Sequence, residues 1–137
     1  MKILLAVDGS EHCLAAVDSL IVHADWFREK PRVELVTVHL PVPAVGASKA
    51  QAQKYYQEEG EASLAAAKKK LDAAKIPYSD RVLVGPVAET LVKHAKDARC
   101  DLIYIGTRGM TAAANALLGS TATKVLHIST VPVLLAK

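Results

Sequence analysis

The residues best suited to chemistry are three glycines and a serine within one short stretch. Gly106 and Gly109 are separated by two residues, and nine further residues lead to Gly119 and Ser120. Glycine is favoured where the backbone takes a positive φ or approaches a ligand closely. A helix that begins at such a Gly-Ser pair leaves backbone N–H groups free, and these suit phosphate oxygens. The spacing therefore predicts a cradle for the phosphates of a nucleotide.

The elements on either side must position this stretch. The apolar run 102–105 predicts a buried strand before it, and residues 122–129 predict a short helix after it. Asp8 follows another apolar run, at residues 3–7. Ligands of parallel sheets bind outside the carboxyl ends of the strands, where the strand order reverses. If these two strands are neighbours at that point, Asp8 and the glycine stretch face one pocket.

Apolar runs and helical periodicity alternate along the whole chain, which predicts a parallel sheet with right-handed crossovers. Ser10 is expected to cap the first helix, and Gly60 is a weak point within a long one. No repeat or linker divides the chain, so we expect a single α/β domain over residues 1–137, a Rossmann-like, doubly wound five-stranded sheet with helices on both faces. The expected strands are 3–7, 33–40, 79–84, 102–105 and 131–136, and the long helix spans about 49–75.

Composition narrows the class of protein. Half of the 137 residues are hydrophobic, but there are only one Trp, one Phe and four Tyr, so the core is aliphatic. The net charge of +3 comes from scattered residues, without the dense basic tract of a nucleic-acid-binding protein. No segment approaches 18 uncharged apolar residues, and the two cysteines suggest reduced, packed thiols. We therefore expect a cytoplasmic protein with no membrane or nucleic-acid partner.

Two well-known phosphate motifs are absent. No Gly-x-x-x-x-Gly-Lys-Ser/Thr sequence occurs, and no two of the seven glycines form the Gly-x-Gly pair of a dinucleotide fingerprint. The complete pattern, Gly106-x-x-Gly109-x9-Gly119-Ser120, instead resembles the ATP-binding signature of the universal stress protein family. The resemblance extends to the opening run 2–10, to 36–40, to 101–106, and to the closing 131–133. It implies a sheet of strand order 3-2-1-4-5 and the binding of ATP.

The resemblance also implies roles for individual residues. Asp8 would face the ribose or help to hold Mg²⁺, and the backbone at Ala6 and Leu40 would frame the adenine. The last glycine and the two hydroxyl residues after it would hold the β- and γ-phosphates at a helix N-terminus. Arg108 occupies a variable position, where a guanidinium could pair with a phosphate. The complete expected ATP-binding set is Ala6, Val7, Asp8, Leu40, Ile105, Gly106, Arg108, Gly109, Gly119, Ser120 and Thr121.

Simpler interpretations remain open for several of these residues. Asp8 could only cap the first helical turn, and the glycines could only be turn residues. None of the five histidines has a metal-ligand spacing, although His12 and His39 follow the first two strands and could lie near the pocket mouth. Cys13 is expected to pack in the core, and Tyr55 and Tyr56 could help to close the loop at 41–51 over the nucleotide.

Three functions compete at this point. The first is an ATP-binding regulatory protein of the stress response, in which the nucleotide orders the loops at 41–51 and 107–118. The second is a slow ATPase or a nucleotidyl-transfer enzyme, but the chain has no Walker lysine and no clear base beyond Asp8 or Glu11. The third is a nucleotide-free dimerisation module. A homodimer is expected in any case, through the apolar and uncharged segment Val131 to Ala136 at the sheet edge.

Overall fold

The computed structural model describes residues 1–42, 46, 48–107 and 118–137. Arg108 and Gly109, two of the residues expected to bind phosphate, lie outside the described residues, as does part of the loop at 41–51. Strands and helices alternate as expected, with one additional 3₁₀ helix, η1, that the sequence did not predict. The elements are β1 (Lys2–Ala6), α1 (Glu11–Val22), η1 (Ala24–Trp26), β2 (Arg32–His39), α2 (Lys49–Ala73), β3 (Tyr78–Val84), α3 (Val87–Asp97), β4 (Leu102–Gly106), α4 (Ser120–Ile128) and β5 (Val133–Ala136).

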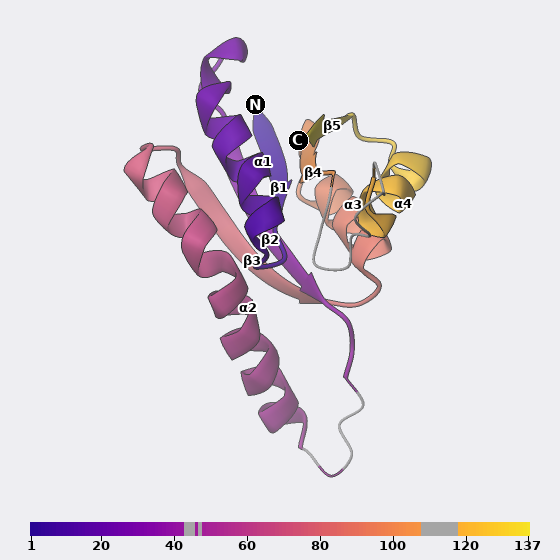
Figure 1. The fold of residues 1–137 in the computed structure, drawn as a ribbon. Helices are drawn as coiled ribbons and strands as arrows, with labels where there is room; N and C mark the ends of the chain where they lie inside the picture. The colour runs from indigo at the N-terminus through magenta and orange to yellow at the C-terminus, as the bar shows by residue number, and fades with distance from the viewer. Residues whose placement is uncertain (43–45, 47, 108–117) are drawn as a thin grey trace.

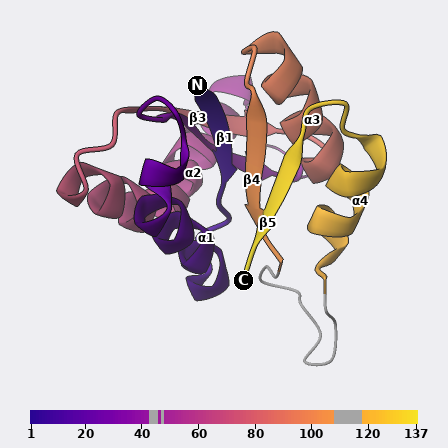
Figure 2. The same ribbon diagram turned by 90° about the horizontal axis from the view of Figure 1, so that it is seen from above.

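The strands form one parallel sheet in the order β3-β2-β1-β4-β5. The chain builds outward from β1 through β2 to β3, and then crosses back to add β4 and β5 on the other side of β1. Helices α1 and α2 cover one face of the sheet, while α3 and α4 cover the other (Figure 1, Figure 2). This architecture confirms the expected doubly wound α/β fold and its strand order.

The strand β1 contributes to both hydrophobic layers, because successive side chains of a strand point to opposite faces. Ile3 and Leu5 pack in the layer under α1 and α2, where they join Leu64. Leu4 points the other way and packs with Leu91 in the layer under α3 and α4. None of the five side chains is more than 2% exposed. The sheet is therefore covered on both faces, which explains why its central strands β1 and β4 are almost continuously apolar.

Side-chain caps set the starts of the first two long helices. Ser10 caps α1, as expected, and its Oγ accepts a hydrogen bond from the Cys13 N–H at 3.3 Å. Ser48 and Gln51 form a reciprocal capping box at the start of α2. With 25 residues, α2 is about 37 Å long and extends well past the end of the sheet (Figure 1). No helix in the described part of the chain is long and apolar enough to cross a membrane.

The last two elements differ slightly from the expected boundaries. Helix α4 begins at Ser120, two residues earlier than expected, because Gly119 is its N-cap. Strand β5 begins at Val133 rather than at Val131. The Ser129 hydroxyl holds Val131 in a turn through hydrogen bonds to its N–H (3.1 Å) and its carbonyl (2.7 Å), and Pro132 has no N–H to donate. The segment available for edge pairing is therefore shorter than expected.

Candidate functional site

The expected pocket lies beyond β1 and β4, because the strand order reverses between these two neighbours. The register pairs Leu5 with Tyr104, and counting three residues further sets Asp8 opposite Thr107. The chain leaves β1 toward α1 on one face and leaves β4 toward α4 on the other (Figure 2). The structure thus brings Asp8 and the start of the glycine stretch to one edge of the sheet, as the sequence predicted.

Asp8 is built into a tight turn at the end of β1. Its Oδ1 accepts hydrogen bonds from the Ser10 N–H at 2.9 Å and from the Ser10 hydroxyl at 2.5 Å. Gly9 between them has φ +84°, and an added Cβ would lie 3.2 Å from the Cα of Ser63 in α2. Only glycine takes this conformation readily. Asp8 therefore orients the helix cap without being the cap itself, and the turn fixes its carboxylate at the carboxyl edge.

The start of α4 is held beside the end of β4. The Gly119 N–H donates to the Thr107 carbonyl at 2.5 Å, and the Thr107 N–H donates to the Ala136 carbonyl of β5 at 3.0 Å. No side chain caps α4. Within the described residues, the N–H groups of Ser120 and Thr121 have no acceptor, in contrast to the capped starts of α1 and α2. Such a helix start attracts an anion.

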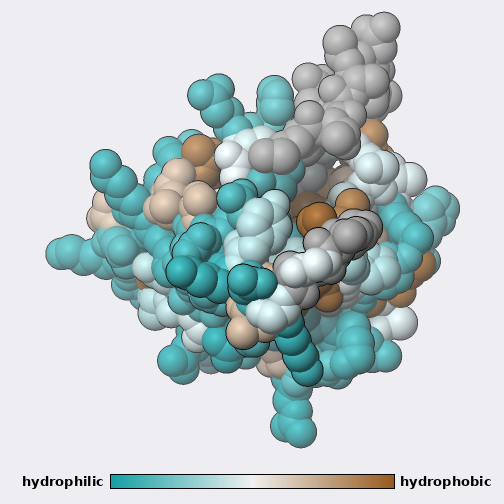
Figure 3. Space-filling view, turned by 90° about the horizontal axis from the view of Figure 1, so that it is seen from below, coloured by the Kyte–Doolittle hydropathy of each residue, from teal (hydrophilic) through white to brown (hydrophobic). Residues whose placement is uncertain are grey.

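The end of β2 adds an apolar surface to this edge. Leu40 and Val42 are 63% and 53% exposed, which is unusual for large aliphatic side chains. The hydroxyl of Tyr56 in α2 accepts a hydrogen bond from the Val42 N–H at 2.6 Å and ties this segment to the helix. His39 precedes them, and its Nε2 is buried with no hydrogen-bond partner among the described residues. Figure 3 shows apolar surface between the two grey segments.

Some of the expected site residues do not expose their side chains at the carboxyl edge. Val7 and Ile105 are 5% and 6% exposed and belong to the hydrophobic core. The Val7 N–H donates to the Val36 carbonyl at 2.9 Å, so this residue can offer only its own carbonyl group. Ala6 and Gly106 are the last residues of β1 and β4. Both residues therefore lie at the carboxyl edge, where their backbone groups can reach a ligand.

Neither a reactive thiol nor a metal cluster lies in the described part of this site. Burial raises the pKa of the Cys13 thiol, and its Sγ donates to the Ser10 carbonyl at 3.0 Å. The thiol therefore stays protonated and is a poor nucleophile. Among the described residues, no group of three or more His, Cys, Asp or Glu side chains could hold a metal ion. A cation at Asp8 would therefore need most of its ligands from a bound phosphate or from water.

Sequence reasoning missed a buried ionic cluster elsewhere in the sheet. Glu34 of β2 is 3% exposed, and its carboxylate lies 3.0 Å from the Nε2 of His94 and 3.4 Å from the Nζ of Lys2. Burial disfavours its charge, but the hydrogen bond from His94 and the charge of Lys2 outweigh this, so the pKa of Glu34 is lowered. A glutamate inside an apolar run was the available signal, although its partners lie far away in the sequence.

The fold and the arrangement at the carboxyl edge can now be compared with known proteins. The model of the universal stress protein family matches residues 1–137. This chain belongs to the universal stress protein family. The match spans every strand and helix described above, so it confirms the resemblance seen in the sequence.

Individual members of the universal stress protein family agree with this assignment. The chain is 31% identical to the universal stress protein in QAH/OAS sulfhydrylase 3′region of Thermus aquaticus, over 98% of this chain and 97% of that one. The solved structure of MJ0577, from Methanocaldococcus jannaschii, superposes with a TM-score of 0.86 at 28% identity, covering 99% of this chain and 94% of that one. A universal stress protein in complex with cAMP gives a TM-score of 0.75 at 25% identity, covering 100% and 97%.

Proposed function

We propose that this universal stress protein binds ATP at the carboxyl edge between β1 and β4 and acts as a nucleotide-dependent regulatory protein of the stress response. The observation that carries the proposal is the uncapped start of α4, whose N–H groups lie beside the end of β4. Membership of the family and the neighbour in complex with cAMP support an adenine nucleotide as the ligand.

The residues at this edge fit the parts of ATP in order. The exposed Leu40 offers an apolar face for the adenine, and backbone groups at Ala6 can read its edge. Asp8 can accept a hydrogen bond from a ribose hydroxyl. The N–H groups of Ser120 and Thr121 can hold the terminal phosphates, where the helix dipole favours negative charge. Arg108, Gly109, Gly106 and Gly119 complete the proposed set.

Magnesium is expected to arrive with the nucleotide. Mg²⁺ prefers oxygen ligands and keeps several waters, so one carboxylate and the phosphate oxygens suffice for it. Asp8 is the carboxylate placed to contribute. When bound, the ion would neutralise phosphate charge. The protein's own part is then to orient the triphosphate through the start of α4 and to hold the ribose through Asp8.

The residues at this edge favour a regulatory function over efficient catalysis. Hydrolysis needs an oriented water and a group to receive its proton, and the carboxylate of Asp8 is already engaged with Ser10. We expect the nucleotide to contact the segments 41–51 and 107–118 and so to change the surface that partner proteins meet. We also propose that residues 1–137 form one cytoplasmic domain, and that two copies associate through the edge strand β5.

Calorimetric titration with MgATP and with cAMP tests the binding proposal, together with analysis of any nucleotide released by denaturing the purified protein. Ser120→Asp should weaken ATP binding roughly tenfold or more, because it adds a negative charge where the phosphates must lie. The fold should survive, since an acidic residue in a first helical turn is favourable. Ala50→Asp, in the first turn of α2, is the control and should bind ATP normally.

Three outcomes would count against the proposal. If nothing binds at millimolar MgATP, there is no nucleotide site. If Ser120→Asp binds as tightly as the parent chain, α4 does not hold the phosphates. If added ATP is converted to ADP at a rate of several turnovers per minute, the protein is an enzyme and the regulatory hypothesis is wrong.

A further inference from the structure

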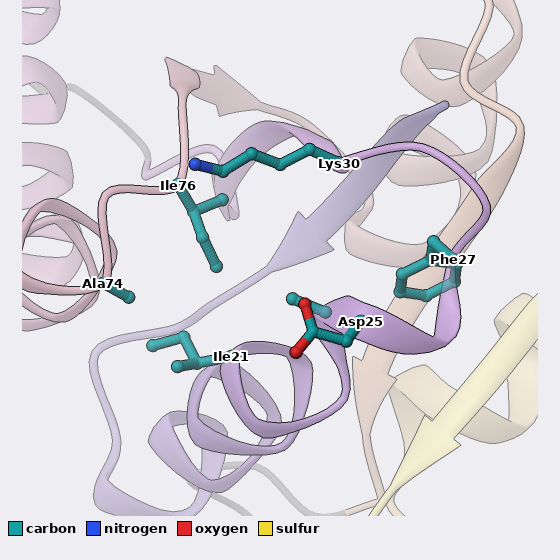
Figure 4. A pocket seen from close by; sticks show the side chains of 7 residues that line it. Ile21, Asp25, Phe27, Lys30, Ala74 and Ile76 are labelled. Carbon is teal, nitrogen blue, oxygen red and sulfur yellow. The ribbon is translucent and has the colours of Figure 1, made fainter.

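A depression lies at the opposite, amino-terminal edge of the sheet, between the end of α1 and the end of α2. Its volume is about 440 Å³. Ile21, Phe27 and Ile76 form an apolar floor, and Lys30 and Asp25 stand at its rim (Figure 4). Lys30 extends toward Ile76, while Asp25 approaches from η1. This depression is separate from the nucleotide site, because β1 is five residues long and sets the two edges about 16 Å apart.

Large apolar side chains continue the floor onto the surface. Val22 follows Ile21 in the chain and is 72% exposed. Trp26 lies between two residues that line the depression and is 74% exposed, the highest value among the large hydrophobic side chains of the described chain. Tryptophan is enriched at the centres of protein interfaces. An exposed tryptophan beside an apolar depression is therefore typical of a docking surface.

Unpaired positive charges surround the same edge. A second depression of about 450 Å³ adjoins the first, shares Lys30 with it and is also lined by Arg32. Neither Lys30 nor Arg32 has an ion-pair partner among the described residues, and the same holds for Arg28 and Lys75 in the neighbouring connections. Several cations of the helix surfaces, by contrast, are paired with carboxylates; these pairs include Lys68 with Asp80, Lys70 with Asp18, Lys93 with Asp97 and Lys124 with Glu89.

The acidic groups at this edge are fewer than its unpaired cations. Glu29 lies 3.6 Å from the N-terminal ammonium group, and the Asp101 carboxylate accepts the Lys2 N–H at 2.8 Å. Asp25, and Asp101 in the lining of the second depression, have no ion-pair partner within the described residues, but the four unpaired cations outnumber them. The uncompensated charge of the edge is therefore positive, next to an apolar floor and an exposed indole ring.

We propose that this edge binds an acidic segment of a partner protein, with one large apolar side chain seated on the floor between α1 and α2 and its carboxylates on Lys30 and Arg32. The charge complementarity identifies the occupant. A second copy of this chain would bring a net charge of +3 to a positive edge. A nucleic acid would leave most of the apolar floor uncovered, and its phosphates would meet Asp25.

The surface would give a nucleotide-binding protein a partner site at the edge away from its nucleotide, although the proposal does not depend on nucleotide binding. Charged pairs at the rim would steer the encounter, and the buried apolar anchor would supply most of the affinity. Association should therefore be faster at low salt, whereas dissociation should depend mainly on the anchor residue.

Panning of a displayed library of random 12-residue peptides against the full chain tests this proposal. The chain is immobilised through its C-terminus, which follows β5 at the far edge, and the library is first depleted on the double variant Lys30→Glu/Arg32→Glu. The enriched peptides should combine several Asp or Glu residues with a Leu, Ile, Phe or Trp. The best peptide is then synthesised and titrated against the protein, with the emission of Trp26, the only tryptophan, as the readout.

The expected result is a change in Trp26 emission that saturates, with an affinity about tenfold lower for the double variant. Lys69→Glu is the matched control: Lys69 is exposed on α2 and has no ion-pair partner in the described chain, so its reversal should leave binding unchanged. The peptide with its apolar residue replaced by Ser should bind at least tenfold more weakly. The proposal would be overturned if the enriched peptides lacked acidic residues, or if Lys69→Glu lost as much peptide affinity as the double variant. Tight binding of single-stranded RNA that competes with the peptide would also overturn it.

Discussion

Glu34 is the residue whose environment departs most from expectation. Its carboxylate is buried in β2 and is reached from three elements: by His94 of α3, by Lys2 of β1, and by Arg81 of β3, whose Nε lies 3.9 Å away. Lys2 also donates to the carbonyl of Ala98 at 3.0 Å. If the buried carboxylate of Glu34 is removed, the positive charges around it are left without a partner. The cluster therefore joins the sheet to the layer that contains α3.

The replacement Glu34→Gln tests the contribution of this carboxylate. Because its folded pKa lies below the unfolded value near 4.5, its stabilisation is complete above that value and is lost as the pH falls through the folded pKa. At pH 7 the variant should lose about 3 kcal/mol of unfolding free energy. The difference from the parent should shrink as the pH falls from the unfolded value through the lowered folded pKa. Urea unfolding at a series of pH values measures both effects.

A surface carboxylate provides the comparison for Glu34. Asp18 pairs with Lys70 at 2.7 Å, but both side chains are partly exposed. Asp18→Asn should change stability by less than about 1 kcal/mol, because solvent screens the pair. A loss from Glu34→Gln that is no larger than this, or that does not vary with pH, would show that the buried cluster does not stabilise the fold.

The packing of α2 on the sheet depends on Gly60. An added Cβ would lie 2.3 Å from the Cγ1 of Val82 in β3, which is far inside van der Waals contact. The sequence marked Gly60 only as a weak point in a long helix. The structure shows that this glycine lets α2 approach β3 closely. The close contact offsets the low helix propensity of glycine.

Gly60→Ala should therefore destabilise the protein, although alanine is the better helix former. Valine is stiff at χ1 and cannot move aside easily, so the overpacking should cost about 1–3 kcal/mol. Val82→Ala removes the two methyl groups that would lie closest, at 2.3 and 2.4 Å, and leaves only the Cβ at 2.9 Å. The double variant should be more stable than Gly60→Ala alone, and thermal unfolding of all four proteins measures the coupling. A stabilising Gly60→Ala would contradict the close approach.

Local sequence patterns predicted the positions of the strands and helices better than the contacts between them. The sequence pattern located every strand to within two residues, and it was plainest for the central strands β1 and β4, because burial on both faces requires continuous hydrophobic sequence. The start of α4 was placed two residues late, since a glycine N-cap is a weak signal. The clash at Gly60 and the partners of Glu34 could not be predicted, because Val82 and His94 come close only when the sheet and its helices assemble.

The candidate site was predictable to a similar extent. The register of β1 and β4 brings Asp8 to the expected edge, because the end of each parallel strand follows from its apolar run. The packing of Val7 and Ile105 in the core was not predicted, since a strand end gives no sign of which residue is the last one covered. Nor did the sequence indicate the amino-terminal depression, whose walls come from the end of α1 and from two connections that are far apart in the sequence.

At the scale of the whole molecule, the parallel sheet separates two surfaces of different chemistry. The carboxyl edge combines a helix start with exposed aliphatic residues, whereas the amino edge combines cations with Trp26. A third surface is the open side of β5, which is one edge of the sheet. Its outward backbone groups are unpaired within the described chain, and an edge of this kind invites pairing with a second copy.

Backbone geometry allows the proposed dimer to be tested without breaking the sheet. The carbonyls of Pro132 and Ala136 accept hydrogen bonds from Ile103 and Thr107, so alternation along the strand turns the N–H of Val133 outward. Val133→Pro removes that donor and should convert a dimer into a monomer at micromolar concentration. Val133→Thr keeps both the donor and the β-branched shape, so it should remain a dimer. Light scattering gives the mass, and circular dichroism confirms that both variants fold. If the parent chain is itself monomeric, or if the proline variant dimerises as tightly as the parent, β5 is not the interface.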